Sequence, residues 1–111
     1  WDDFTRTLMI AGKALTPLPQ PERNDDTAVE GRESPVWLAF SHDEGCLMAF
    51  SPSKVIRGVL AVLLEKANSL TKQQRAAFDF ENYLSQCQLE RHLSQSRGNG
   101  IKSVIAKLRD I

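Results

Sequence analysis

The chain has 111 residues, which is enough for one folded domain and too few for several. Its 41% hydrophobic, 25% charged and 7% aromatic residues exclude a disordered or fibrous chain. The 14 basic and 14 acidic side chains cancel, so no overall field attracts nucleic acid or an anionic membrane. The charge is nevertheless uneven, because residues 1–50 hold 4 basic and 9 acidic side chains whereas residues 51–111 hold 10 and 5.

The cysteine content and the hydropathy predict a cytoplasmic protein. The two cysteines are Cys46 and Cys87, and a chain of this size folds without a disulfide, so we expect a reducing compartment. The longest nearly apolar run covers residues 59–64, whereas a membrane-crossing helix needs about 20 residues. Because the chain opens at Trp1 rather than Met, we expect the natural protein to have further residues before it.

The first thirty residues predict a helix, a connector and a short strand. A helix is expected over residues 2–15, where apolar residues recur with the spacing of one helix face. Prolines alternate over residues 17–21, and their fixed φ and missing N–H predict an extended connector over residues 16–22. Residues 27–30 are a candidate edge strand.

A β-hairpin is predicted over residues 36–51. Residues 36–40 alternate between two apolar sets, residues 42–45 form a turn that ends in glycine, and residues 46–50 form the return strand. Both faces of the return strand carry apolar side chains, so we expect both to be at least partly covered.

Helices are predicted after the hairpin. Ser51 and Pro52 suit the N-cap and first turn of an apolar helix that ends near Asn68. Residues 71–74 have the form of a capping box, and Asp79 can cap the short helix that follows. A helical turn at residues 89–93, a loop over 94–100 and a final amphipathic helix complete the chain. That last helix is built on Ile101, Val104, Ile105 and Leu108.

The order of these elements indicates the α+β class and a single domain over residues 1–111. Strands gathered in one segment, with helices before and after them, favour an antiparallel sheet over alternating parallel units. We therefore predict a small antiparallel sheet of about three strands, with its central hairpin at 36–51. This sheet is expected to pack against N-terminal, central and C-terminal helices.

Residues that carry chemistry are sparse. His42 with Cys46, and Cys87 with His92, lack the spacing of common zinc sites, so we predict no metal. The basic stretch over residues 91–110 lacks aromatic stacking partners, but it keeps a nucleic-acid-binding module open as an alternative function. No Ser/His/Asp or Cys/His arrangement is visible, so the sequence shows no catalytic site.

Three ordered blocks of sequence carry a more specific signal: VEGRESPVWL at 29–38, RGVLAVLL at 57–64 and HLSQSRGNGI at 92–101. Together with the opening WDD and residues 11–15, they resemble the SufE/CsdE sulfur-acceptor family along nearly the whole chain. Members of that family have an α+β fold and bind a pyridoxal-phosphate-dependent cysteine desulfurase. They accept its persulfide sulfur on a loop cysteine and pass it on, usually toward iron-sulfur cluster assembly.

The resemblance implies a non-enzymatic sulfur acceptor or activator, with no cofactor of its own. Its expected partners are the desulfurase and a downstream Fe-S scaffold or other sulfur acceptor, and the chain is expected as a monomer or in that heterocomplex. The resemblance also implies a partner-binding surface. Its residues are Gly31, Arg32, Glu33, Ser34, Val36, Trp37 and Arg97, with core or helix packing as the alternative for Val36, Trp37 and Arg97.

Arg32 stands where the family has its acceptor cysteine, after Gly31. A guanidinium contains no sulfur, so this position cannot perform the family's transfer step. Two substitutes remain open. Cys46 is expected at the far end of the hairpin, about five residues or about 17 Å from the loop, and is therefore distant. Cys87 falls where the family generally has a small or apolar residue, which favours packing.

Overall fold

A three-stranded antiparallel sheet forms one layer of the structure, a computed structural model that describes residues 6, 10, 12, 17–29, 35–86 and 95–111. Its strands are β1 (Ala28–Val29), β2 (Val36–Ser41) and β3 (Cys46–Phe50), in the order β1-β2-β3. Ser41 pairs with Cys46, so the turn covers residues 42–45 as predicted, and Gly45 adopts a φ of 69°. Only glycine enters this left-handed region without steric cost. The predicted hairpin is confirmed.

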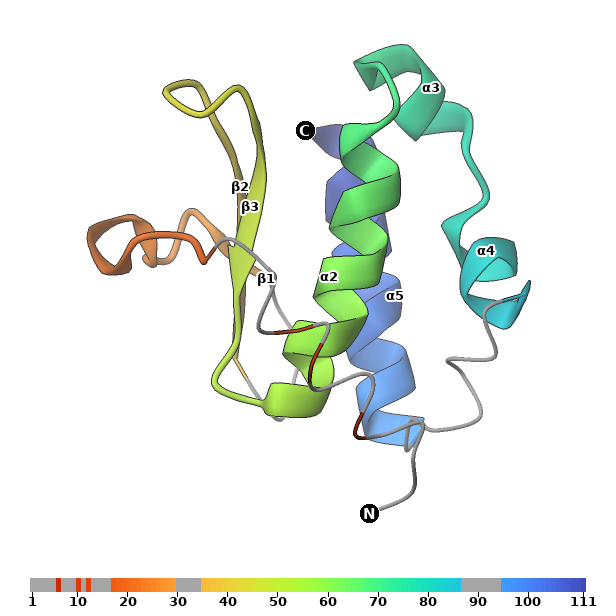
Figure 1. Ribbon diagram of the computed structural model, residues 1–111, viewed down its shortest axis with the longest axis horizontal. Helices are drawn as coiled ribbons and strands as arrows, with labels where there is room; N and C mark the ends of the chain where they lie inside the picture. The colour runs from red at the N-terminus through yellow and green to blue at the C-terminus, as the bar shows by residue number, and fades with distance from the viewer. Residues whose placement is uncertain (1–5, 7–9, 11, 13–16, 30–34, 87–94) are drawn as a thin grey trace.

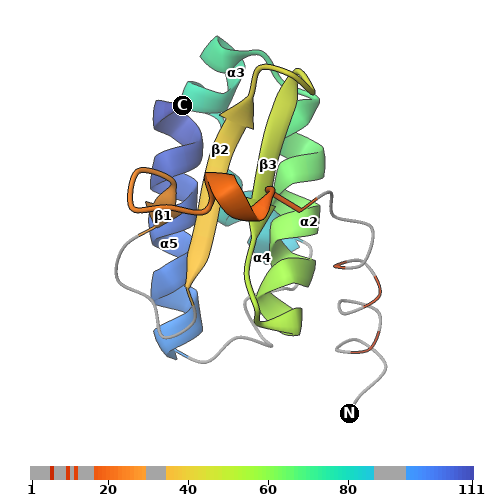
Figure 2. The ribbon, with the colours of Figure 1, turned by 90° about the vertical axis from the view of Figure 1, so that its left-hand side faces the viewer.

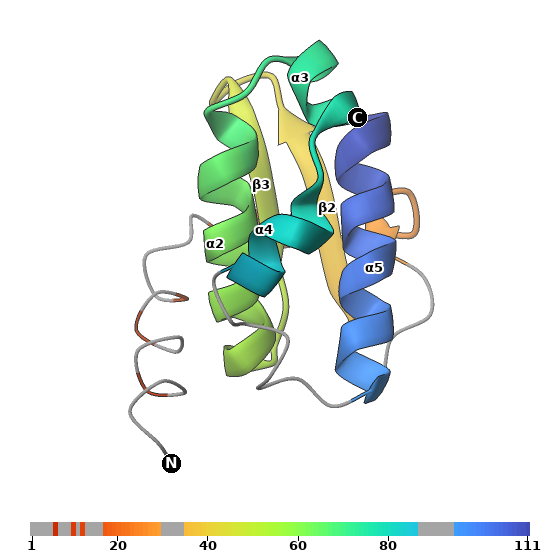
Figure 3. The same ribbon diagram turned by 90° about the vertical axis from the view of Figure 1, so that its right-hand side faces the viewer.

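Two long helices lie on the same side of the sheet (Figure 1) and form one layer against it (Figure 3). They are α2 (Lys54–Asn68) and α5 (Gln95–Asp110). The short helices α3 (Lys72–Ala77) and α4 (Phe80–Gln86) connect them, and α4 crosses the pair on the side away from the sheet (Figure 3). This layered sheet-and-helix arrangement confirms the α+β prediction.

The hydrophobic core lies between the sheet and the two long helices. Alternation along the strands sends one set of side chains from β2 and β3 toward α2. The final helix presents its predicted stripe to the same core, with Val104 and Leu108 fully buried. The core members from the sheet, α2, α4 and α5 are Val29, Val36, Leu38, Leu47, Ala49, Val55, Ile56, Val59, Leu60, Leu63, Leu64, Ala67, Phe80, Leu84, Ile101, Val104, Ile105 and Leu108.

The opposite face of the sheet is covered by the segment over residues 17–27 (Figure 2). Leu18 is buried there, and its N–H donates to the carbonyl oxygen of Ala49 at 3.1 Å. The prediction of a purely extended connector was wrong, because the segment contains the 3-10 turn η1 (Gln20–Glu22). A proline with φ near −65° fits the first turn of such a helix, and Pro21 occupies that turn.

Two predicted helix starts are corrected by the structure. The N-cap of α2 is Ser53, whose side chain accepts from the Ile56 N–H at 3.3 Å, rather than Ser51. Ser51 is fully buried at the end of the sheet, and its hydroxyl accepts instead from the Ser53 N–H. The last helix begins at Gln95, so residues 95–100, predicted as a loop, are helical despite two glycines.

Other predicted ends are confirmed. Thr71 and Gln74 form the reciprocal capping box of α3. The carboxylate of Asp79 accepts from the Asn82 N–H at 2.9 Å, as expected for the start of α4. The predicted turn at 89–93 lies outside the described residues.

The predicted N-terminal helix over residues 2–15 lies mostly outside the described residues, although Arg6, Ile10 and Gly12 are helical. Gly12 packs directly against α2: a Cβ built on it would lie 2.9 Å from the backbone nitrogen of Gly58. In the described part of the chain, no helix combines the length and the apolar character that crossing a membrane requires.

Candidate functional site

The candidate site lies where β1 passes into β2. Val29 and Val36 are antiparallel partners, so the connecting segment leaves and re-enters the sheet at one point. Four predicted partner-binding residues in that segment lie outside the described residues: Gly31, Arg32, Glu33 and Ser34. We call this end of the sheet the loop end, and we call the end at residues 41–46 the turn end.

Val36 and Trp37, the first residues of β2, point to opposite faces of the sheet. Val36 is only 2% exposed and belongs to the core, so its described contacts are packing contacts. Trp37 is half-buried on the other face, where its ring stacks on that of Phe50 with centroids 6.3 Å apart and an interplanar angle of 27°. Of these two predicted partner contacts, Trp37 is the one with accessible surface.

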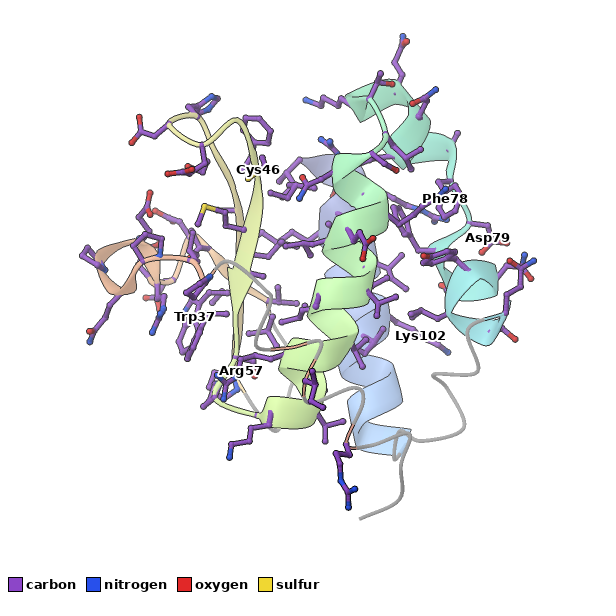
Figure 4. The ribbon with its side chains drawn as sticks, viewed as in Figure 1. Trp37, Cys46, Arg57, Phe78, Asp79 and Lys102 are labelled. Carbon is purple, nitrogen blue, oxygen red and sulfur yellow. The ribbon has the colours of Figure 1, made fainter. Side chains whose placement is uncertain are left out.

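Two guanidinium groups flank the Phe50 ring. The Cζ atom of Arg23 lies 3.6 Å from the ring centroid, and that of Arg57 lies 5.6 Å from it. Arg23 comes from the segment that covers the outer face, and Arg57 from the start of α2. Figure 4 shows Arg57 beside Trp37 at the loop end. We call Arg23, Trp37, Phe50 and Arg57 the arginine-aromatic patch.

Sequence reasoning missed three members of this patch. Phe50 could have been found, because a turn at residues 42–45 makes it the cross-strand partner of Trp37. Arg23 and Arg57 gave no local signal, since one approaches across a proline-containing connector and the other from a helix. Their convergence on one ring is a tertiary feature.

Arg97, the other predicted partner-binding residue, lies in the first turn of α5. The start of α5 lies at the same end of the molecule as the starts of β2 and α2 (Figure 1, Figure 2). The backbone therefore brings the Arg97 position and the entry to β2 to one end of the fold. The side chain of Arg97 lies outside the described part of the chain.

The turn end holds Cys46, a half-buried free thiol paired with Ser41. β2 separates Cys46 from the loop end by the five residue steps from Val36 to Ser41, or about 17 Å, as the sequence predicted. Cys87, the other candidate thiol, lies outside the described residues. The rings of His42 and Phe40 pack edge to face, with centroids 5.2 Å apart. Among the residues that the structure describes, no group of three possible metal ligands occurs.

The basic stretch in the last helix is partly engaged in intramolecular contacts. Lys107 Nζ donates to the Asp26 carbonyl oxygen at 3.3 Å, and an Nη group of Arg109 donates to the Phe78 carbonyl oxygen at 2.9 Å. Burial lowers the pKa of Lys107, and the nearby Asp26 carboxylate opposes that shift. These two cations hold loops of their own chain, which disfavours a continuous phosphate-binding face.

Comparison with known proteins settles the family. A family model described as the SufE Fe-S metabolism associated domain matches residues 1–111. The chain belongs to the SufE family. It is also similar to an uncharacterized SufE-like protein of Rhizobium etli, with 31% identity over 116 residues that cover 99% of this chain and 78% of the relative. This SufE domain is thereby associated with Fe-S metabolism, and the family implies interaction with a cysteine desulfurase in general.

Proposed function

We propose that this SufE-family chain docks on a pyridoxal-phosphate-dependent cysteine desulfurase at the loop end and acts there as an adaptor or activator for Fe-S cluster assembly. The observation that supports this most directly is the position of the family's acceptor segment. It is anchored at the Val29–Val36 pair, beside Trp37 and at the same end as the Arg97 position. We further propose the cytoplasm as its location, from the cysteine usage.

Sulfur transfer itself requires a thiolate at the docking point. The thiolate attacks the outer sulfur of the desulfurase persulfide, a new S–S bond forms, the old S–S bond breaks and the desulfurase thiolate leaves. Arg32 has no sulfur with which to make that bond. We therefore propose that this chain docks on the desulfurase without accepting sulfur at residue 32.

The intact mass of the chain after incubation with a family-type cysteine desulfurase and free cysteine tests the proposal. We expect an Arg32→Cys variant to gain sulfur that reducing agent removes, and the unaltered chain to gain none. Arg32→Cys combined with Cys46→Ser and Cys87→Ser is the matched control, and it should gain sulfur equally. In a parallel pull-down, the unaltered chain should bind the desulfurase.

Two results would contradict the proposal. Sulfur on the unaltered chain that disappears in a Cys46→Ser or Cys87→Ser variant would move the acceptor to that thiol. Failure of both the unaltered and Arg32→Cys chains to bind the desulfurase would remove the docking role.

A further inference from the structure

The arginine-aromatic patch is built so that its cations keep hydrogen-bonding capacity. A guanidinium has five N–H donors, and stacking its flat face on a ring leaves the edge donors for planar acceptors. Arg23 uses Nε to donate to the Leu18 carbonyl oxygen at 2.7 Å, which holds the group over Phe50 and commits one donor of five. Arg23 is therefore oriented by its own chain with donors to spare.

Arg57 is unusual within the patch because its Nε–H is buried with no hydrogen-bond partner in the described structure. An unpaired buried N–H is unfavourable, so a neutral residue would be less costly at this position in the isolated chain. The Phe50 ring offsets part of that cost through cation-π attraction.

The surroundings restrict the anion that these two arginines can accept. Exposed acidic side chains lie in the same segment as Arg23, at Glu22, Asp25 and Asp26. A long polyanion such as nucleic acid would have to extend past these carboxylates and would be repelled by them, whereas a single protein carboxylate needs to reach only the two cations. Half-buried Trp37 adds a flat apolar surface next to those cations, a composition that is enriched at protein interfaces.

We infer that the arginine-aromatic patch binds a carboxylate-bearing segment of the desulfurase, with Arg23 and Arg57 pairing with Asp or Glu side chains and Trp37 and Phe50 packing against their neighbours. This inference rests on the proposed docking function and assigns to it a defined contact surface at the loop end. Because Trp37 is the second residue of β2, the patch lies at the loop end, where the proposed docking takes place.

Binding of the full chain to a pyridoxal-phosphate-dependent cysteine desulfurase tests this assignment. We expect an Arg23→Gln/Arg57→Gln variant to bind at least about tenfold more weakly, because the carboxylates of the desulfurase would then be buried in the contact without a cation. The control, Lys72→Gln/Lys102→Gln, removes the same charge from exposed sites on α3 and α5 and should change the Kd less than about twofold. Raising the salt concentration should weaken binding of the unaltered chain more than that of the patch variant.

Loss of the Arg23–Leu18 hydrogen bond could unfold the double variant, so the single variant Arg57→Gln is measured as well. Arg57 Nε makes no described hydrogen bond, so this substitution removes the charge without breaking a contact of that kind. Equal binding by the patch and control variants would overturn the patch while leaving desulfurase docking intact. Absence of binding by the unaltered chain would overturn both. Self-association of the unaltered chain in sedimentation, lost in the patch variant, would identify a second copy as the occupant and also overturn the inference.

Discussion

The two ends of the β2–β3 hairpin offer a partner different chemistry. The loop end gathers the entry to β2, the arginine-aromatic patch and the start of α5, whereas the turn end carries Cys46, His42 and a tight glycine turn. Although Cys46 is the thiol that the structure describes, the length of β2 separates it from the patch. The thiol of Cys46 therefore does not lie beside the loop end, although it belongs to the same hairpin.

The largest expected effect is on stability, and it tests how closely Gly12 packs against α2. In Gly12→Ala, the new Cβ would meet backbone atoms of Gly58 and Arg57 rather than a flexible side-chain end. We expect a loss of about 1–3 kcal/mol in unfolding free energy, measured by chemical denaturation. Ile10→Ala, at a 59% exposed site two residues earlier, is the control and should change little. Equal stability of the two variants would show that the N-terminal segment can move away from α2 at no cost.

The next largest effect is the loss of stability expected when Asn68, which binds β3 near the turn end, is replaced. The Asn68 side-chain amide accepts from the Leu47 N–H at 2.8 Å and donates to the Leu47 carbonyl oxygen at 3.3 Å. Asn68→Ala should lower the unfolding free energy by about 1–2 kcal/mol, because both hydrogen bonds are lost. Desulfurase affinity should stay unchanged, in contrast to the patch variants. Glu65→Ala on the same helix is the control, and a drop in affinity for Asn68→Ala alone would bring the turn end into the docking surface.

A smaller effect tests whether Ser53 is the N-cap of α2. Ser53→Ala removes the cap acceptor and should cost about 1 kcal/mol, while Ser53→Asp keeps an acceptor and should recover most of it. Hydrogen exchange of the Ile56 amide should accelerate in the alanine variant. Unchanged exchange and stability would mean that Ser53 does not cap the helix in solution.

The smallest effect is a pH dependence. The folded pKa of Lys107 lies below its ordinary value of 10.5 because burial disfavours the charged form, so the folded state releases this proton before the unfolded state does. The contribution of Lys107 to stability should therefore increase as pH rises from its folded pKa toward 10.5. Denaturation of the unaltered chain and of Lys107→Met across this range should show the difference between them shifting in favour of the unaltered chain. A flat or opposite trend would contradict the assigned direction.

Local patterns were sufficient to predict much of this fold. Strict alternation and a glycine turn located the hairpin register, and the Thr71–Gln74 box and the Asp79 cap are short-range hydrogen-bond patterns that the sequence displays directly. The start of α5 was missed because Gly98 and Gly100 have a low helix propensity, whereas the helix runs through both of them. Ser51 was mistaken for the cap because its burial at the sheet end is invisible in sequence.

The candidate site was less predictable than the fold. The family resemblance located Arg32 and Trp37, and alternation was enough to place Trp37 opposite Phe50. The approach of Arg23 and Arg57 to that ring depends on how the connector crosses the sheet and where α2 begins. Contacts between segments that far apart have no period or spacing that a single sequence reveals.

The contacts along β3 also affect whether this edge strand can pair with a strand of another copy of the chain. β3 is the last strand of the sheet, so its outward N–H and carbonyl groups would otherwise be a template for strand addition. Asn68 occupies both groups of Leu47, and the Leu18 N–H occupies the carbonyl oxygen of Ala49. The bonds that fix α2 and the segment over residues 17–27 in place thereby also occupy outward-facing backbone groups of β3, which makes this edge less available for strand addition by another chain.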